Sequence, residues 1–174
     1  MKRKILILLG STKANSANQK IAQFFTNETT AFFEVETYPL SILPYFNPDL
    51  ETGDLPTTVA EFRSKIEASD GVFICTPEYV FSIPGILKNA LEWTVSTMIF
   101  HEKPMAIITA ASSGETAHAS IQLIIKTIGG VFDEKTSLLI SSPKSKMDNE
   151  GNFTNLETKA LVENLIQRFR ENID

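Results

Sequence analysis

Hydroxyl, amide and lysine side chains gather in one short stretch near the beginning of the chain. Ser11, Lys13, Ser16 and Asn18 lie between an apolar run and a segment with helical spacing. The N-terminus of a helix has unpaired N–H groups and a partial positive charge, which stabilise an anion. Hydroxyls add donors and Lys13 adds a full charge. Two interpretations remain open: an anion-binding loop, or a polar loop in which Asn15 or Ser16 only caps the helix.

A second unusual loop covers residues 76–93 and follows another apolar run. Its prolines and glycine predict an irregular backbone, and it places Tyr79 and Phe81 just after a strand has ended. Aromatic rings at the mouth of a sheet suit a planar heteroaromatic ligand. The alternative places Phe81 in the core or at a subunit contact, with Tyr79 as an ordinary boundary residue.

The third loop, residues 110–116, is rich in small residues. Small side chains let a ligand ring approach the backbone closely, and Gly114 permits a positive φ angle. The alternative is that Glu115 and Thr116 only begin the next helix. Each of the three loops follows directly after an apolar run and is rich in small residues or hydrogen-bond donors. This shared placement favours one ligand site formed by all three loops.

The elements that must position these loops follow from two alternating periodicities. Continuous apolar runs predict strands buried on both faces, and apolar residues at helical spacing predict helices between them. The expected strands are Ile5–Leu9, Phe32–Val35, Val72–Cys75, Met105–Thr109 and Ser137–Ile140. The expected helices start near Ala17, Pro56, Pro84 and Ala117, and the last starts at a capping box formed by Thr154 and Glu157, with Leu161, Val162, Leu165, Ile166 and Phe169 on its apolar face. Such alternation predicts right-handed crossovers and a doubly wound α/β domain with a parallel sheet. Ligands of such folds bind beyond the carboxyl ends of the strands.

Composition limits the possible functions. The chain has 174 residues, 43% of them hydrophobic, and a net charge of -5, so we expect one domain over residues 1–174. The acidic balance argues against nucleic-acid binding. No apolar run approaches the ~20 residues that span a membrane, and we expect a cytoplasmic protein.

Side-chain catalysis has little support in the sequence. There is no G-x-S-x-G motif, and we expect the two histidines, His101 and His118, to be exposed. No cluster of residues has the spacing of metal ligands. Cys75, at the end of a predicted strand, is interpreted as a buried structural thiol. The sequence therefore nominates no catalytic side chain and no metal site.

Two motifs together resemble the NADPH-dependent FMN reductase family, a flavodoxin-like group that includes chromate, quinone and azo-dye reductases. They are G-S-x-[KR]-x-x-S-x-N after the first strand and T-P-E-Y-x-x-S-I-P-G-x-L-K-N-A-L-E-W after the third. The resemblance extends from Ile5 to about Phe153. It implies a three-layer sandwich with a five-stranded parallel sheet and helices on both faces.

The resemblance also implies a set of FMN-binding residues. The FMN phosphate is expected on Ser11, Lys13, Ser16 and Asn18. The isoalloxazine is expected against Pro77, Glu78, Tyr79 and Ser82, with Ser112, Ser113 and Gly114 on its other approach. Backbone N–H groups near Glu78 and Ser113 are expected to stabilise negative charge on the reduced ring.

The sequence departs from the family pattern at two places. Lys13 stands where the family usually has arginine, and a lysine supplies a cation without the two-pronged phosphate contact. Val80-Phe81 stands where the family usually has Asn-Gly. The second departure removes a side-chain amide and a flexible backbone point beside the expected flavin.

The implied activity is hydride transfer from NADPH or NADH to FMN, followed by reduction of a small-molecule acceptor: a quinone, a flavin, an azo compound or a metal oxyanion. Family members are usually homodimers and sometimes tetramers. The flavin carries the redox chemistry. Two other interpretations are an FMN electron carrier of flavodoxin type, which does not itself oxidise NAD(P)H, and an interaction module without flavin. No residue is identified that binds the 2′-phosphate of NADPH.

Overall fold

The computed structural model describes residues 2–174 and contains one five-stranded parallel sheet with strand order β2-β1-β3-β4-β5. The strands are β1 (Arg3–Leu9), β2 (Phe33–Tyr38), β3 (Gly71–Thr76), β4 (Met105–Ala111) and β5 (Ser137–Ser141). The chain leaves β1 in one direction to form β2 and returns past it to form β3. The order of strands therefore reverses between β1 and β3, which is where such sheets bind ligands.

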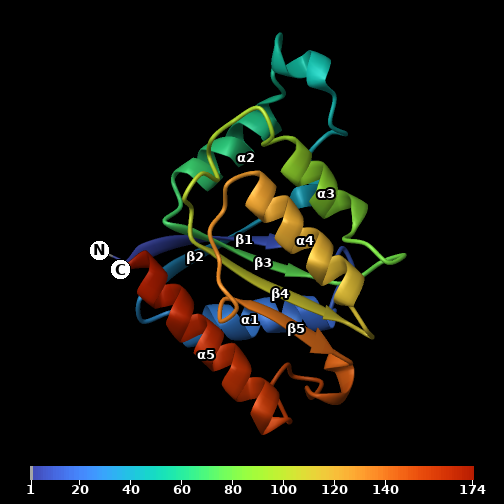
Figure 1. Ribbon diagram of the computed structural model, residues 1–174, viewed down its shortest axis with the longest axis vertical. Helices are drawn as coiled ribbons and strands as arrows, with labels where there is room; N and C mark the ends of the chain where they lie inside the picture. The colour runs from blue at the N-terminus through green and yellow to red at the C-terminus, as the bar shows by residue number, and fades with distance from the viewer. Residues whose placement is uncertain (1) are drawn as a thin grey trace.

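Helices cover both faces of the sheet, as Figure 1 shows. They are α1 (Ala17–Thr29), α2 (Thr57–Glu67), α3 (Gly85–Glu92), α4 (Glu115–Thr127) and α5 (Leu156–Ile173), with short 3-10 turns η1 (Leu40–Ile42), η2 (Pro48–Glu51) and η3 (Pro143–Ser145). One hydrophobic cluster joins α2, α3 and α4 to the sheet, and another joins α1 and α5 to its other face. The predicted doubly wound three-layer sandwich is confirmed.

Strand β1 shows why a continuous apolar run is needed in the middle layer. Leu6 and Leu8 belong to the cluster beneath α2–α4, whereas Ile5 and Ile7 belong to the cluster beneath α1 and α5. Successive side chains of a strand point to opposite faces, so a strand covered on both sides must be apolar at every position. All four side chains are buried.

Gly10 allows the ends of β1 and β3 to approach closely. Its N–H donates to the carbonyl of Cys75 at 2.9 Å. A Cβ added at Gly10 would lie 2.3 Å from Oγ1 of Thr76, so a side chain there would push the two strands apart. This close approach fixes where the first and second loops leave the sheet.

Several element boundaries differ from those that the sequence predicts. The second strand runs to Tyr38 instead of ending at Val35, because its backbone pairs with β1 as far as Leu8 although its side chains at the sheet edge are largely polar. The last helix is capped by Asn155, whose side chain accepts from the N–H of Thr158, so the predicted capping box at Thr154 is wrong. Leu161, predicted on the apolar face, is 47% exposed.

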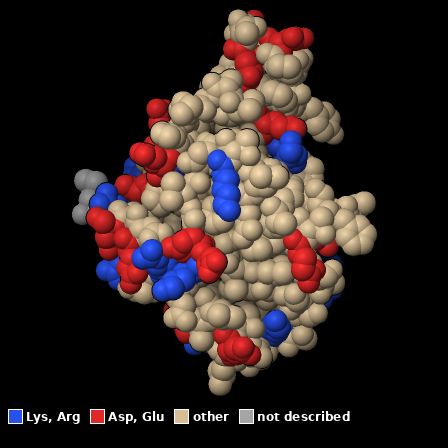
Figure 2. Space-filling model, in the orientation of Figure 1, with Lys and Arg blue, Asp and Glu red and all other residues tan. Residues whose placement is uncertain are grey.

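Charged side chains of both signs are mixed on the face shown in Figure 2, where they surround a broad area with few charges. Arg168, for example, lies against Asp133 and Glu171. None of the helices within residues 2–174 is both long and apolar enough to cross a membrane.

Candidate functional site

A cavity of about 690 Å³ lies beyond the carboxyl ends of β1, β3, β4 and β5. Its polar side is formed by residues 11–20 and by residues 142–149, the segment after β5. The opposite side is formed by residues 77–79, which follow β3, and by residues 110–112 at the end of β4. We call it the hairpin side, because the chain turns back on itself just after residue 79. This volume lies in the range that small-molecule and cofactor sites occupy.

Most of the residues that the sequence nominates line this one cavity. They are Ser11, Lys13, Ser16, Asn18, Pro77, Glu78, Tyr79 and Ser112. Ser82, Ser113 and Gly114 do not line it. Ser82 lies across the turn from Tyr79, and Gly114, at φ +105°, forms the N-cap of α4 and packs beside Leu139.

The polar side presents hydrogen-bond donors at the start of α1. The Ser16 hydroxyl accepts from the N–H of Gln19. Ser16 therefore caps α1, as the interpretation of this segment as a capping loop predicts. The N–H groups of Ala17 and Asn18 donate to no protein acceptor within residues 2–174. The Lys13 side chain is exposed and has no ion pair there. Helix capping and anion binding are therefore compatible at this position. The cap uses one lone pair of the Ser16 hydroxyl and leaves the N–H groups of Ala17 and Asn18 free to bind an anion.

The side chain of Asn18 is hydrogen-bonded to the protein, although the residue lines the cavity. Its amide Nδ2 donates to the carbonyl of Ala110 at 3.0 Å, and its Oδ1 lies 3.4 Å from Sγ of Cys75. The side chain is buried and pins the start of α1 to the ends of β3 and β4. Cys75 is fully buried, as expected, and burial raises the pKa of its thiol far above the ordinary value.

The hairpin side ends in a strained two-residue turn. The backbones of Tyr79 and Ser82 exchange hydrogen bonds of 2.9 and 3.1 Å, and between them Val80 and Phe81 have φ angles of 52° and 55°. Positive φ at both central residues defines a type I′ turn, which favours Asn-Gly and disfavours a β-branched residue. Val80 is 95% and Phe81 76% exposed, so Phe81 lies neither in the core nor against the rest of this chain.

Glu78 connects the hairpin side to α4. Its Oε2 accepts from the N–H of Ala117 at 2.9 Å. Gly114 has no side chain that can cap α4, so a carboxylate from a different loop does so, and a negative charge at a helix N-terminus is favourable. The N–H groups of Glu78 and Ser112 donate to no protein acceptor within residues 2–174.

His118 corrects the prediction that both histidines are exposed. It is half-buried between α4 and the sheet, with Nδ1 2.9 Å from Oγ1 of Thr109 and Nε2 3.1 Å from the Gln122 amide nitrogen. Since that nitrogen only donates, Nε2 of His118 accepts and Nδ1 carries the proton. Burial lowers the pKa of His118. His101 is exposed, as expected.

The segment after β5 also lines the cavity, and it is not among the residues expected from the sequence. Ser142, Lys144 and Ser145 line the cavity together with Pro143, Met147, Asp148 and Asn149. The signal was available, because the rule that selects loops at the carboxyl ends of strands applies equally to the fifth strand. The stretch from Ser141 to Ser145 also repeats the mixture of hydroxyls and lysine found after β1.

The site is equipped for binding more than for acid–base chemistry. It offers unpaired N–H groups, hydroxyls and lysines on the polar side, and Pro77, Tyr79 and small residues on the hairpin side. Within residues 2–174, no group of three or more His, Cys, Asp or Glu side chains could hold a metal ion. This donor set suits a ligand with an anionic group at one end and a flat ring at the other.

Comparison with known proteins identifies relatives along most of the chain. A family model described as NADPH-dependent FMN reductase matches residues 3–132. A 2-hydroxy-1,4-benzoquinone reductase from Burkholderia sp is 27% identical over 97% of this chain and 95% of its own. An NADPH:quinone oxidoreductase from Arabidopsis thaliana is 30% identical, over 94% of this chain and 88% of its own.

A solved structure supports the fold. FerB, a flavoenzyme NAD(P)H:(acceptor) oxidoreductase from Paracoccus denitrificans, superposes with a TM-score of 0.82 at 24% identity. The match covers 98% of this chain and 97% of that one. Sequence and fold comparisons thus agree over nearly all of the molecule.

Proposed function

The chain belongs to the NADPH-dependent FMN reductase family, and from this premise we propose that it carries hydride from NAD(P)H to bound FMN and then electrons to a quinone or azo acceptor. The observation that carries the proposal is the cavity at the β1/β3 reversal, with donors for a phosphate on one side and Pro77 and the Tyr79 ring on the other. The related quinone reductases match along nearly the whole chain.

The residues of the cavity fit FMN. The unpaired N–H groups of Ala17 and Asn18, the hydroxyls of Ser11 and Ser16, and Lys13 form a donor set that suits a phosphate monoester. No carboxylate lies in the β1–α1 loop to oppose that anion. Of the residues named from the sequence, Asn18 contributes through its backbone, since its side chain already bonds Ala110.

When bound, FMN supplies the redox chemistry. The protein's residues bind and orient it. Pro77 and Tyr79 offer flat surfaces to the ring, and the small residues Ala110–Ser112 permit close approach of ring to backbone. The unpaired N–H groups of Glu78 and Ser112 are suited to stabilise negative charge at the ring edge.

We propose that the electron donor and the electron acceptor enter the cavity one after the other through the same opening, beside Tyr79. Tyr79, at the rim, is 45% exposed, and the side chains beyond it point into solvent. No side chain is required as nucleophile or base, and the half-buried His118 is engaged with Thr109 and Gln122. A site built in this way tolerates acceptors of different shape.

The decisive experiment is steady-state turnover by purified protein reconstituted with FMN. With a benzoquinone as acceptor, we expect continuous oxidation of NADPH or NADH and a flavin absorbance band that stays with the protein through gel filtration. Protein that binds FMN but consumes NAD(P)H only when a separate reductase is added would be an electron carrier of flavodoxin type. Protein that neither retains FMN nor melts at higher temperature in its presence would exclude both.

The proposal extends to organisation and location. By analogy with the family, we expect a cytoplasmic homodimer in which residues 1–174 act as one FMN-binding domain. Exposed apolar side chains support a subunit contact: Val80, Phe81, Val95 and Met98. Light scattering would measure the mass in solution, and cell fractionation would test the location.

A further inference from the structure

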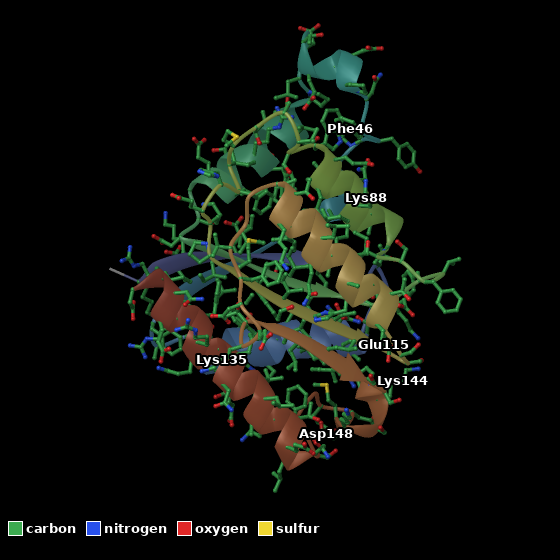
Figure 3. All side chains as sticks on the ribbon, viewed as in Figure 1. Phe46, Lys88, Glu115, Lys135, Lys144 and Asp148 are labelled. Carbon is green, nitrogen blue, oxygen red and sulfur yellow. The ribbon has the colours of Figure 1, made fainter. Side chains whose placement is uncertain are left out.

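Besides Lys13 and Lys20, a third lysine lines the polar side of the cavity, from a loop far along the chain. Lys144 lies in η3, directly after β5, and lines the same cavity as Lys13. Figure 3 shows it beyond the carboxyl end of β5, whereas Lys135 lies at the opposite end of that strand. The family resemblance names no residue of this loop.

The backbone that carries Lys144 is held in place on both sides. The N–H of Ser142 donates to the carbonyl of Ala111 at 2.8 Å, and the Ser142 hydroxyl donates to the carbonyl of Ser112 at 3.4 Å. Farther along, Nζ of Lys20 donates to the carbonyl of Asp148 at 3.2 Å. Pro143 is buried. These contacts with residues 111 and 112 and with Lys20 fix the position of the backbone that carries Lys144.

Ser142 also has an unusual backbone, with φ 51° and ψ 51°. A residue other than glycine is disfavoured in this region, and such strain persists only where surrounding contacts impose it. The bonds to Ala111 and Ser112 supply that constraint. The loop thus turns sharply at Ser142, immediately before the lysine.

The charges of Lys13 and Lys144 have no partner in the described part of the chain. Within residues 2–174, neither ammonium group has an ion-pair partner or a hydrogen-bond acceptor. The chain as a whole is acidic, with a net charge of -5, yet these cations from two separate loops line one cavity, together with two carboxylates, those of Glu78 and Asp148. A ligand with two negative charges would use both, and a phosphate monoester carries nearly two at neutral pH.

We propose that Lys144 is a second cationic contact for the phosphate monoester of FMN, supplied by the β5–α5 loop. This inference rests on the proposed function. It also accounts for the lysine at position 13: one ammonium group gives a single point contact, and a second lysine supplies the second contact that a two-pronged arginine would make.

The test compares flavins with and without the phosphate. FMN and riboflavin are titrated into flavin-free wild-type protein and Lys144→Ala, and binding is followed by quenching of flavin fluorescence. We expect FMN to bind roughly tenfold more weakly to Lys144→Ala, the effect of one charge-assisted hydrogen bond, while riboflavin binds both proteins equally. Lys144→Arg should restore FMN affinity.

Lys135→Ala is the matched control. It removes the same charge from an exposed position at the other end of β5, so it should leave FMN affinity unchanged at low salt. An equal loss in Lys135→Ala would mean that only net charge matters, which would overturn the proposal.

The remaining outcomes separate this inference from the proposed function. Wild-type protein that binds FMN while Lys144→Ala binds it equally well would refute the role of Lys144 and leave the proposed function standing. If FMN affinity is unchanged but KM rises for NADPH and not for NADH, the lysine binds the 2′-phosphate of the donor, and the proposal is wrong. Wild-type protein that does not bind FMN would refute both.

Discussion

The two sides of the cavity are held in place by different kinds of contact. At the start of α1, the polar side is organised by neighbours in the sequence: Ser16 accepts from Gln19, and the N–H of Lys13 donates to the Ser11 hydroxyl. On the hairpin side the contacts join separate elements, as where Glu78 caps α4 at Ala117. The hairpin side also contains two residues in the left-handed region.

This difference separates ligand binding from folding. An exposed side chain on the polar side, such as Lys13, can be removed with little loss of tertiary packing, so its removal should appear mainly in ligand affinity. A change on the hairpin side alters strain and contacts between elements, so it should appear mainly in the free energy of unfolding. The following predictions test that division.

The largest effect is expected on the polar side. Replacing Lys13 and Ser16 together by alanine should weaken FMN binding by about 2–4 kcal/mol, the sum of typical charge-assisted hydrogen bonds. Fluorescence titration of the flavin-free protein measures this as roughly a 30- to 900-fold rise in Kd. A double variant with wild-type affinity would show that the start of α1 does not bind the phosphate.

The double variant also loses a helix cap, which costs about 1 kcal/mol of stability. Asn155→Ala is the matched control, because Asn155 caps α5 through the N–H of Thr158 and does not line the cavity. It should lose similar stability in chemical denaturation while FMN affinity stays unchanged. Weakened FMN binding in this control would attribute the effect to general loosening of the fold.

The same contrast explains what could be predicted from the sequence. The buried strands and the donors at the start of α1 depend on neighbouring residues, and patterns such as Ile5–Leu9 contain that information. The capping of α4 by Glu78 joins residues 39 positions apart, and no local pattern indicates it. At α5, Thr154 and Asn155 are both suitable caps by residue type, and the structure has Asn155, in extended backbone, accept from the N–H of Thr158.

The hairpin itself was the least predictable part. Val and Phe have a low tendency to form tight turns, so no local preference indicates that both adopt positive φ. The turn forms because Tyr79 and Ser82 pair across it while the chain passes from β3 into α3. The resemblance to the family motif indicated that residues 76–93 form part of the site. The positive φ angles of Val80 and Phe81 became visible only in the structure.

The second prediction concerns that strain. Val80→Asn combined with Phe81→Gly should stabilise the protein by about 1–2 kcal/mol, because Asn-Gly suits a type I′ turn and glycine removes one left-handed penalty. Urea denaturation of the flavin-free protein measures the change. Val80→Ala removes the β-branch but keeps a Cβ at the positive φ angle, so it should stabilise the protein by no more than about 0.5 kcal/mol. If the double variant is no more stable, the turn is not a source of strain.

The smallest effect is expected at His118, which supports the hairpin side through Thr109 at the end of β4. Burial lowers its pKa in the folded state, so below about pH 6.5 the unfolded chain binds more protons than the folded one. Stability should then fall as pH decreases from 6.5 to the lowered pKa of the folded state, and be fully present above 6.5. The slope should be well below the ~1.4 kcal/mol per pH unit of one complete proton, since the site is only half-buried.

His118→Gln should flatten this part of the stability profile, measured by urea denaturation at closely spaced pH values. His101→Gln removes the other, exposed histidine and should keep the wild-type profile. Protonation of His118 places a second N–H against the Gln122 amide donor, so the loss should also loosen the residues that follow Thr109. FMN affinity should therefore fall over the same pH range in wild type and not in His118→Gln. If affinity follows pH equally in both proteins, the contact of His118 with Thr109 does not influence the ligand, and the hairpin side is held by Glu78 and its turn.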